Sequence, residues 1–444
     1  MSGGVDSSLA AALLHEQGHE IVGVTLHLWD DDAGLSESLC CSLELTESAR
    51  RVCAHLGVPY YVFNYQREFR RHVIEPFIHA YANGYTPNPC LECNRTIKFR
   101  MLLERARTLG FAYLATGHYA RILGVGDQGS AFSLQPSAFS PQPSALSLQP
   151  SALSRQPSAF SPQPSALSPQ PSAFSPQPSA FSLQPSAVSR QPSALSPQPS
   201  ALSPQPSAFS LQPSAVSRQP SAYQLWRAVD RDKDQSYVLH MLGQQELAHL
   251  CFPVGMLTKP QVRELAAARG LASANQPESQ EICVVPGGDY RELLREAAPT
   301  SLVPGPIVDG AGREIGQHQG LPRYTIGQRR GLGLGGGKPL FVVALDVARN
   351  ALVVGPREAL LCNQFVVDQV SFVATTWPSA PFTCEVQVRA HAAPVPAEVT
   401  PLADGRLDVR LHEPLRALTP GQAAVCYASD QLLGGGRIVR PSAG

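Results

Sequence analysis

Met1-Ser2-Gly3-Gly4-Val5-Asp6-Ser7-Ser8 opens the chain and runs directly into an apolar helical pattern at 9–14. Glycines let a backbone approach a phosphate closely, and the first N–H groups of a helix point at the anion. Besides those N–H groups, the hydroxyls of Ser2, Ser7 and Ser8 are further hydrogen-bond donors to an anion. The stretch therefore predicts a phosphate-binding loop, although it lacks the Gly-Lys-Ser/Thr ending of a Walker A loop. A turn that merely caps the helix is the alternative.

A parallel α/β sheet is the fold that the following pattern predicts. Strand-like runs at 21–28 and 60–63 alternate with helical patterns at 45–56 and 93–109, and such alternation is typical of a sheet covered by helices on both faces. A buried strand is expected before the loop, but only Met1 precedes Ser2. We expect the true start to lie upstream, because loss of a central strand would expose the unpaired edges of its neighbours.

A long low-complexity insertion interrupts this domain at 131–222. It repeats Q-P-S-A with a period of seven residues, and a proline in every repeat disfavours a helix. We predict a disordered or polyproline-like surface insertion. The flanks, 113–122 and 223–229, are predicted to form one hairpin that the insertion interrupts.

The second half of the chain has a different pattern. After Pro304, short β-runs are separated by Gly and Pro, which predicts a small β-rich domain followed by a β-barrel. With 444 residues, of which 43% are hydrophobic, the chain is long enough for several domains. We predict a catalytic domain at 1–283 interrupted by the insertion, a central β-rich domain at 284–357 and a C-terminal β-barrel at 358–444.

The composition of the chain limits which binding partners and which cellular compartment we expect. Lys+Arg and Asp+Glu both number 35, so any RNA-binding surface must be a local patch. The ten cysteines are too sparse for a secreted disulfide scaffold, and neither a signal peptide nor a long apolar run is present. The sequence therefore predicts a cytoplasmic protein with reduced thiols and no membrane partner.

Three cysteines are candidates for chemistry. Cys90 and Cys93 stand in Cys90-Leu-Glu-Cys93-Asn94, which follows a proline-rich turn and opens a helix, where the helix dipole favours thiolates. Cys283 lies in an irregular segment bounded by Pro and Gly. The C-x-x-C pair alone could be half of a zinc site, but no second pair or H-x-x-x-H completes it.

Together these motifs resemble a known family. The loop is similar to that of the PP-loop ATP pyrophosphatases, and the chain outside the insertion resembles the tRNA-specific 2-thiouridylases. The resemblance rests on motifs in a fixed order: S-G-G-V-D-S-S, Gly23-Val-Thr-Leu-His-Leu-Trp29, Asn88-Pro-Cys-Leu-Glu-Cys-Asn94, Ala115-Thr-Gly-His-Tyr119, Lys233-Asp-Gln-Ser-Tyr237, Ser279-Gln-Glu-Ile-Cys283, Arg323-Tyr-Thr-Ile-Gly-Gln-Arg-Arg-Gly331, and Pro420-Gly-Gln-Ala to Leu433-Gly-Gly-Gly436.

The resemblance implies a function, a fold and a set of site residues. It implies ATP-dependent 2-thiolation of uridine 34 in the tRNAs for Glu, Gln and Lys, by a PP-loop domain of the adenine nucleotide alpha hydrolase-like fold. Cys93 would be the nucleophile and Cys283 the persulfide carrier. ATP and Mg²⁺ would be the cofactors, with ATP held by Ser2, Gly3, Gly4, Val5, Asp6, Ser7, Ser8, Leu26 and Gly117. Contacts with tRNA would come from Asn88, Pro89, Cys90, His118, Lys233, Asp234, Gln235, Arg323, Tyr324 and Gln422.

The route of the sulfur stays open between two alternatives. The C2 oxygen of uracil is a poor leaving group, so ATP would first convert it to an adenylate that sulfur then displaces. The sulfur would come from a cysteine desulfurase or a sulfur-carrier protein, through a persulfide on Cys283. Many relatives carry Asp where this chain has Cys90, so Cys90, Cys93 and Cys283 could instead hold a [4Fe–4S] cluster whose open iron binds sulfide.

Two other functions remain alternatives at this point. One is another PP-loop adenylating enzyme, a ligase or amidotransferase, which would not need Cys93 or Cys283. The other is a catalytically inactive tRNA-binding protein, which a genuinely truncated N-terminus would favour.

Overall fold

The computed structural model describes residues 1–29, 43–124, 223–277, 290–335, 338–374 and 376–439. The predicted insertion at 131–222 and Cys283 lie outside these residues, so the structure does not test the predictions made for them. None of the described helices has the length and apolarity needed to cross a membrane.

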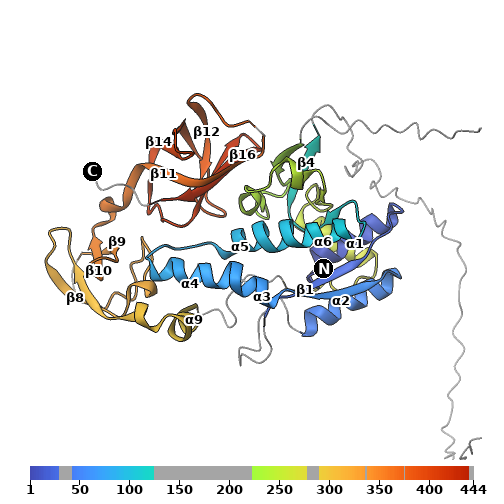
Figure 1. The fold of residues 1–444 in the computed structure, drawn as a ribbon, viewed down its shortest axis with the longest axis horizontal. Coiled ribbons are helices and arrows are strands. Elements are labelled where there is room, and N and C mark those ends of the chain that lie inside the picture. Colours follow the sequence, from blue (N-terminus) through green and yellow to red (C-terminus); the bar gives the residue numbers. More distant parts are fainter. Residues whose placement is uncertain (30–42, 125–222, 278–289, 336–337, 375, 440–444) are drawn as a thin grey trace, which may run out of the picture. The chain divides into compact units, whose positions relative to one another are not determined.

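The N-terminal region is the predicted parallel α/β domain (Figure 1). Helix α1 (Val5–Glu16) leads to β1 (Gly23–His27), α2 (Leu43–Leu56) and β2 (Tyr60–Asn64), and β1 pairs in parallel with β2 over five residues. A second parallel pair joins β3 (Leu114–Ala115) to β6 (Leu250–Cys251). No strand of the described residues links the two pairs.

Helix α8 (Lys259–Ala268) packs against α1 and brings a late segment of the chain to the phosphate loop. Apolar residues of α1, including Leu9 and Leu13, share a buried cluster with Val262 and Ala266 of α8. The cluster is buried because the apolar positions of each helix recur at helical spacing and face each other. The start of α8 therefore lies beside the start of α1.

Two long helical runs lie between β2 and β3 in the chain. The first comprises α3 (Gln66–Phe69), η2 (Arg70–Ile74) and α4 (Glu75–Ala82), and the sequence analysis did not predict it. The second comprises α5 (Pro89–Glu92), η3 (Cys93–Leu102) and α6 (Leu103–Thr108), so the predicted helix at 93–109 starts four residues earlier. Both runs contain turns with wider π-type hydrogen bonding, which are often found at functional sites.

The predicted hairpin around the insertion is confirmed. Strands β4 (Ala120–Gly124) and β5 (Tyr223–Arg227) pair antiparallel over five residues. Short elements then lead to α8, namely η5 (Ser236–Leu239), α7 (Gln244–Leu247) and β6.

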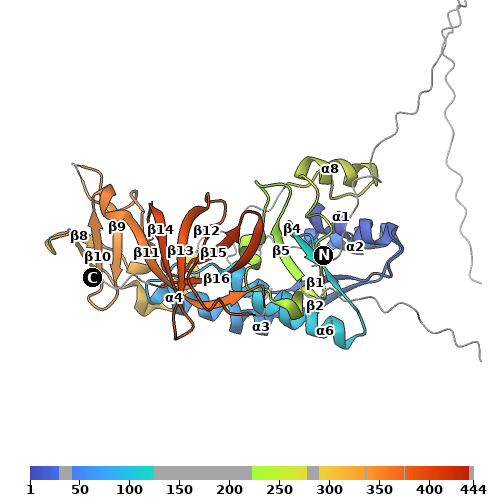
Figure 2. The ribbon, with the colours of Figure 1, turned by 90° about the horizontal axis from the view of Figure 1, so that it is seen from above.

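The C-terminal β-barrel is also confirmed, as a closed ring of six strands (Figure 2). The strands follow the order β11 (Leu361–Phe372), β14 (Leu407–Arg416), β13 (Val395–Pro401), β12 (Phe382–Gln387), β15 (Ala423–Ala428) and β16 (Gln431–Ile438), and β16 pairs back with β11. Alternate residues of β14, such as Leu407, Val409 and Leu411, fill the interior with the period of two that a strand requires. Strand β16 also pairs with β5, so the barrel sheet continues into the hairpin.

A small β-rich domain stands between these two parts of the chain. It contains α9 (Tyr290–Ala297), the short turns η7 (Pro299–Leu302) and η8 (Leu321–Arg323), and a sheet with the order β8-β7-β10-β9. The strands are β7 (Gly305–Val308), β8 (Glu314–His318), β9 (Phe341–Asp346) and β10 (Ala351–Gly355), and η9 (Arg357–Leu360) leads on to the barrel. Its core is built from Ile307, Val342, Leu352 and Val354.

Candidate active site

The phosphate loop has the backbone geometry that its glycines predict. Gly3 has a positive φ of 77°, and a Cβ there would lie 2.2 Å from the carbonyl oxygen of Leu45. Gly4 has an extended backbone and is the N-cap of α1, so it directly precedes the N–H groups of the first helical turn. The hydroxyl of Ser8 donates to the Gly4 carbonyl at 2.9 Å, and the Ser2 N–H donates to the Ser7 hydroxyl at 3.1 Å. The loop is thus held by its own side chains.

Asp6 of the loop is held by two residues that the sequence analysis did not assign to the site. The Lys259 ammonium donates to both carboxylate oxygens, at 2.8 and 2.9 Å, and the Tyr119 hydroxyl donates to one of them at 2.8 Å. Lys259 is 7% exposed, an unusual degree of burial for a lysine. The sequence around Lys259 signals only the start of a helix, where Thr258 and Gln261 form a capping box.

Gly117 touches the loop directly. A Cβ at this position would lie 2.6 Å from the backbone nitrogen of Ser7 and 2.7 Å from the carbonyl carbon of Asp6. Only glycine permits so close an approach of two backbones. The structure therefore brings Gly117 and the 2–8 loop together, as their common assignment to ATP requires.

Leu26 and Cys93 lie around one apolar cluster, although their assigned roles differ. The buried members of the cluster include Cys93, Phe69 and Ile97, and Leu26 of β1 packs against them. Cys93 is 1% exposed, whereas Cys90 is partly buried. The cluster connects the strand expected at ATP with the helix that carries the expected nucleophile.

Asn88 starts the helix that carries the two thiols. Its side-chain oxygen accepts a hydrogen bond from the Cys90 N–H at 3.1 Å, and Pro89 occupies the first helical position. Both are favourable at a helix start, because the first N–H groups lack partners inside the helix. Cys283 is outside the described residues, so the three predicted cluster ligands are not measured together. Within the described residues, no group of three or more His, Cys, Asp or Glu side chains is placed to hold a metal ion.

His118, one of the residues assigned to tRNA, is packed between aromatic rings. Its ring centre lies 5.4 Å from that of Phe99 and 6.0 Å from that of Phe252, and its Nδ1 is 2.8 Å from the Thr116 hydroxyl. Burial, together with the nearby charge of Lys98, holds the pKa of His118 well below its ordinary value. The imidazole is therefore neutral at physiological pH.

Asp234 and its neighbour Gln235 have different surroundings. The Asp234 side chain is 5% exposed and accepts hydrogen bonds from the Ala228 N–H at 2.8 Å and the Ser236 hydroxyl at 2.7 Å, besides its ion pair with Arg227. These contacts give it a role in holding β5 to η5. Gln235 is exposed, and its side-chain oxygen accepts a hydrogen bond from the Tyr119 N–H at 2.9 Å.

The other residues assigned to tRNA lie in three different parts of the chain. Lys233 is partly exposed and precedes Asp234. Arg323 ends the turn η8, and Tyr324 follows it with 6% of its surface exposed. Gln422 precedes β15, and its side-chain amide donates to the Thr86 carbonyl at 2.8 Å. That contact places Gln422 close to the turn before Asn88.

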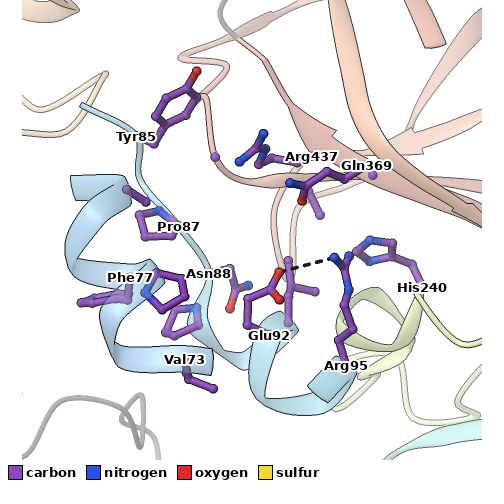
Figure 3. Close-up of a pocket in the computed structure, with 17 residues that line it drawn as sticks. Val73, Phe77, Tyr85, Pro87, Asn88, Glu92, Arg95, His240, Gln369 and Arg437 are labelled. Atoms are coloured by element: carbon purple, nitrogen blue, oxygen red, sulfur yellow. Dashed lines mark ion pairs between the residues drawn. The ribbon is translucent and has the colours of Figure 1, made fainter. Parts of the chain in front are cut away.

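A cavity of about 250 Å³ lies beside this turn (Figure 3). Asn88 and Pro89 line it, together with the ion pair of Glu92 and Arg95, whose charged atoms are 3.6 Å apart. Buried His240 also lines it. Burial, aided by the charge of Arg95, lowers the pKa of His240 to about 4. The sequence analysis found the turn but not the cavity, because its other walls come from distant segments.

Comparisons with known proteins agree with this architecture. Family models match the chain at residues 1–140 and 213–287 (tRNA methyl transferase HUP domain), 291–356 (tRNA methyl transferase PRC-barrel domain) and 362–438 (aminomethyltransferase beta-barrel domain).

Curated relatives match over almost the whole chain. The tRNA-specific 2-thiouridylase MnmA of Roseiflexus sp. (strain RS-1) is 54% identical, over 99% of this chain and 98% of its own length. The proteins of the same name from Chloroflexus aggregans and Heliobacterium modesticaldum are 53% and 40% identical, over 100% and 99% of this chain and 98% and 91% of their own lengths. The chain therefore belongs to the tRNA-specific 2-thiouridylase family.

Proposed function

We propose that this protein transfers sulfur to C2 of uridine 34 in tRNA in an ATP-dependent reaction. The observation that carries the proposal is the single apolar cluster shared by Leu26, expected at ATP, and Cys93, expected at the reacting base. Such a reaction needs a nucleotide site and a reactive thiol close together, and the cluster contains one residue expected at each. The names of the curated relatives support the same reaction.

The loop fits the polyphosphate of ATP. Gly3 and Gly117 stand where a Cβ would strike backbone atoms, and the loop ends at the start of α1, where N–H groups favour an anion. The 2–8 loop, Leu26 and Gly117 would hold the nucleotide, with Mg²⁺ neutralising its phosphates. When bound, ATP supplies an adenylate leaving group for the C2 oxygen of the uracil.

The thiols would carry the sulfur. We assign the persulfide to Cys283: its outer sulfur attacks C2 and displaces AMP, and Cys93 then attacks the inner sulfur, leaving a disulfide between the two cysteines. An external dithiol reopens that disulfide, and a cysteine desulfurase or a sulfur carrier renews the persulfide. The alternative is a [4Fe–4S] cluster on Cys90, Cys93 and Cys283, and only this route requires Cys90.

The tRNA would contact several of the described surfaces. Lys233 and Gln235 are accessible for direct contacts, whereas Asp234 and His118 would act by holding the segments that carry them. Arg323, Tyr324 and Gln422 would extend the surface over the central domain and the barrel, whose boundaries we place at 284–357 and 358–444. The expected substrates are the tRNAs for Glu, Gln and Lys, in the cytoplasm.

Thiolation of an unmodified tRNA-Glu transcript tests the proposal. The protein is incubated anaerobically with ATP, Mg²⁺, a cysteine desulfurase and cysteine, and thiolated tRNA is detected by its retardation in a mercury-containing gel. We expect a retarded band that Cys93→Ser and Cys283→Ser each abolish. No band, even after cluster reconstitution, would contradict the proposal. Cys90→Asp separates the two routes, because Asp is the residue that many relatives carry at this position: the variant should keep the persulfide relay and lose the cluster.

A further inference from the structure

A second cavity, of about 560 Å³, lies between the hairpin strand β5 and the barrel. Its lining comes from the end of β5 and the segment after it, from β12 with the following turn, and from the turn between β15 and β16. The Arg227 N–H donates to the Asp430 carbonyl at 2.8 Å, so β5 is tied to that last turn. Among the described residues that line the cavity, only Asp234 was assigned above to ATP, sulfur or tRNA. Its volume is typical of a small-molecule site.

The register of the barrel strands brings polar side chains together at this cavity. Val386 belongs to the buried cluster inside the barrel. Glu385 and Gln387, on either side of it, therefore point outwards, because successive side chains of a strand alternate between its faces. Tyr427 lies directly opposite Glu385 in the ladder of β12 and β15, and the Arg227 guanidinium lies over the Tyr427 ring, 3.5 Å from its centre. Arg227, Glu385 and Gln387 thus share one wall of the cavity.

Two buried polar atoms of this wall have no partner among the described residues. Arg227 is 8% exposed, and one of its terminal nitrogens lies 3.2 Å from an Asp234 oxygen, but its Nη2 donates to no described residue. Gln387 is 4% exposed, and its amide nitrogen donates to the Arg389 carbonyl at 2.9 Å, whereas its Oε1 accepts no hydrogen bond from any described residue. Buried donors and acceptors without partners destabilise a fold, so such atoms commonly bind a ligand or an ordered water.

The charges of the lining oppose an anion. Asp234 neutralises Arg227, and Asp430 forms an ion pair with Arg231. Glu385 is partly exposed and forms no ion pair with any described residue, so one carboxylate of the lining is left without a cation. A phosphate or carboxylate ligand would be repelled by this carboxylate, and so would the backbone of an RNA. The cavity therefore favours a neutral ligand.

The available groups match the hydrogen-bonding edge of guanine. They are one donor, Nη2 of Arg227, and two acceptors, Oε1 of Gln387 and the Glu385 carboxylate. The Watson–Crick edge of guanine presents one acceptor, O6, followed by two donors, N1–H and the 2-amino group. Adenine and cytosine each present a single donor group on this edge, and uracil places its one donor between two acceptors. Residues 392–394, two alanines and a proline, add apolar surface for the flat ring.

We propose that this cavity binds guanine in the form of a free nucleoside. Arg227 donates to O6, Glu385 accepts from N1–H and the 2-amino group, and Gln387 accepts the second hydrogen of the 2-amino group. Arg227 belongs to the hairpin of the catalytic domain, whereas Glu385 and Gln387 belong to the barrel, so a bound base links the two. The inference is independent of the proposed function, because neither ATP nor the thiols take part.

Calorimetric titration of the full chain with nucleosides tests the site. Saturating ATP and Mg²⁺ are present throughout, so that guanosine is kept out of the expected ATP site. We expect guanosine to bind, and inosine, which lacks only the 2-amino group, to bind about tenfold more weakly, whereas adenosine and cytidine should not bind. Glu385→Gln should weaken guanosine binding about tenfold, because an amide replaces the carboxylate that accepts from two donors. Glu398→Gln, at an exposed position of β13 outside the lining, is the matched control and should bind guanosine like the wild type.

Gln387→Leu gives a second test. It removes the partner of the second amino hydrogen, so it should reduce the preference for guanosine over inosine severalfold, an effect that a purely structural role would not produce. The inference is overturned if the wild type does not bind guanosine, if guanosine and inosine bind equally, or if Glu385→Gln binds guanosine as tightly as Glu398→Gln. A guanine-containing single-stranded RNA that binds more tightly than guanosine, with the same dependence on Glu385, would overturn the assignment to a free nucleoside. If the chain does not bind ATP but binds guanosine in a manner that depends on Glu385, the proposed reaction fails and this site stands.

Discussion

Replacing Lys259 with methionine should weaken ATP binding about thirtyfold. The substitution keeps most of the side chain's length and removes the ammonium that contacts both oxygens of Asp6. In the proposed ATP site, the Asp6 carboxylate would then lie near the polyphosphate without its ammonium partner. Repulsion between them should oppose binding, and the loop should lose the contact that holds it against α8.

The magnitude follows from the burial of the pair. Removing one partner of a fully buried ion pair costs about 3–5 kcal/mol, whereas an exposed pair contributes about 0–1 kcal/mol. Lys259 keeps 9% of its side chain exposed and Asp6 keeps 30%, so water compensates part of the loss. We therefore expect about 2 kcal/mol, which corresponds to about thirtyfold in the dissociation constant. Tyr119→Phe removes one hydrogen bond and should cost about fivefold.

Calorimetric titration of each variant with ATP and Mg²⁺ provides the measurement. Lys233→Met is the matched control, because Lys233 is assigned to tRNA and its loss should leave ATP affinity unchanged. The double variant of Lys259 and Tyr119 should show coupling, because both side chains contact the same carboxylate. A Lys259→Met protein that binds ATP within threefold of the wild type would refute the reasoning.

Three further predictions follow from single residues. Gly117→Ala should lower ATP affinity by at least tenfold, because its Cβ would lie 2.6 Å from the Ser7 nitrogen. Gly310→Ala is the control, because a Cβ there would have no atom within 4 Å, and its ATP affinity should not change. Equal ATP affinities of the two variants would contradict the close approach at Gly117. The pKa of His240 is lowered to about 4 in the folded protein, so below pH 6.5 the unfolded chain binds a proton at this residue and the folded chain does not. Folding stability therefore falls as the pH drops, by roughly 3 kcal/mol at pH 4. His240→Gln removes this group and should show a smaller fall of Tm between pH 7 and 5 than the wild type. Burial raises the pKa of Cys251 to about 12, so iodoacetamide at pH 8 should leave it unlabelled in the folded protein, and its rapid labelling, read by mass spectrometry, would contradict that burial.

The sequence was most informative where the signal is local. The glycines of the 2–8 loop, the start of the helix near Cys90 and the paired flanks of the insertion each depend on residues close together in the chain. Their backbone preferences act over one turn or one hairpin, so periodicity and glycine placement predict them. The helical run at 66–82 was missed, because charged residues, histidines and Pro76 interrupt its apolar pattern.

By itself, the sequence determined the α/β start, the barrel at the end and the family motifs that name the candidate residues. Only the tertiary structure decided which distant residues meet. Lys259 reaches Asp6 across 253 positions, β11 closes the barrel on β16, and Arg437 comes to lie beside Tyr85. Such contacts are set by the packing of whole elements around shared apolar clusters, and no local preference of either partner specifies them.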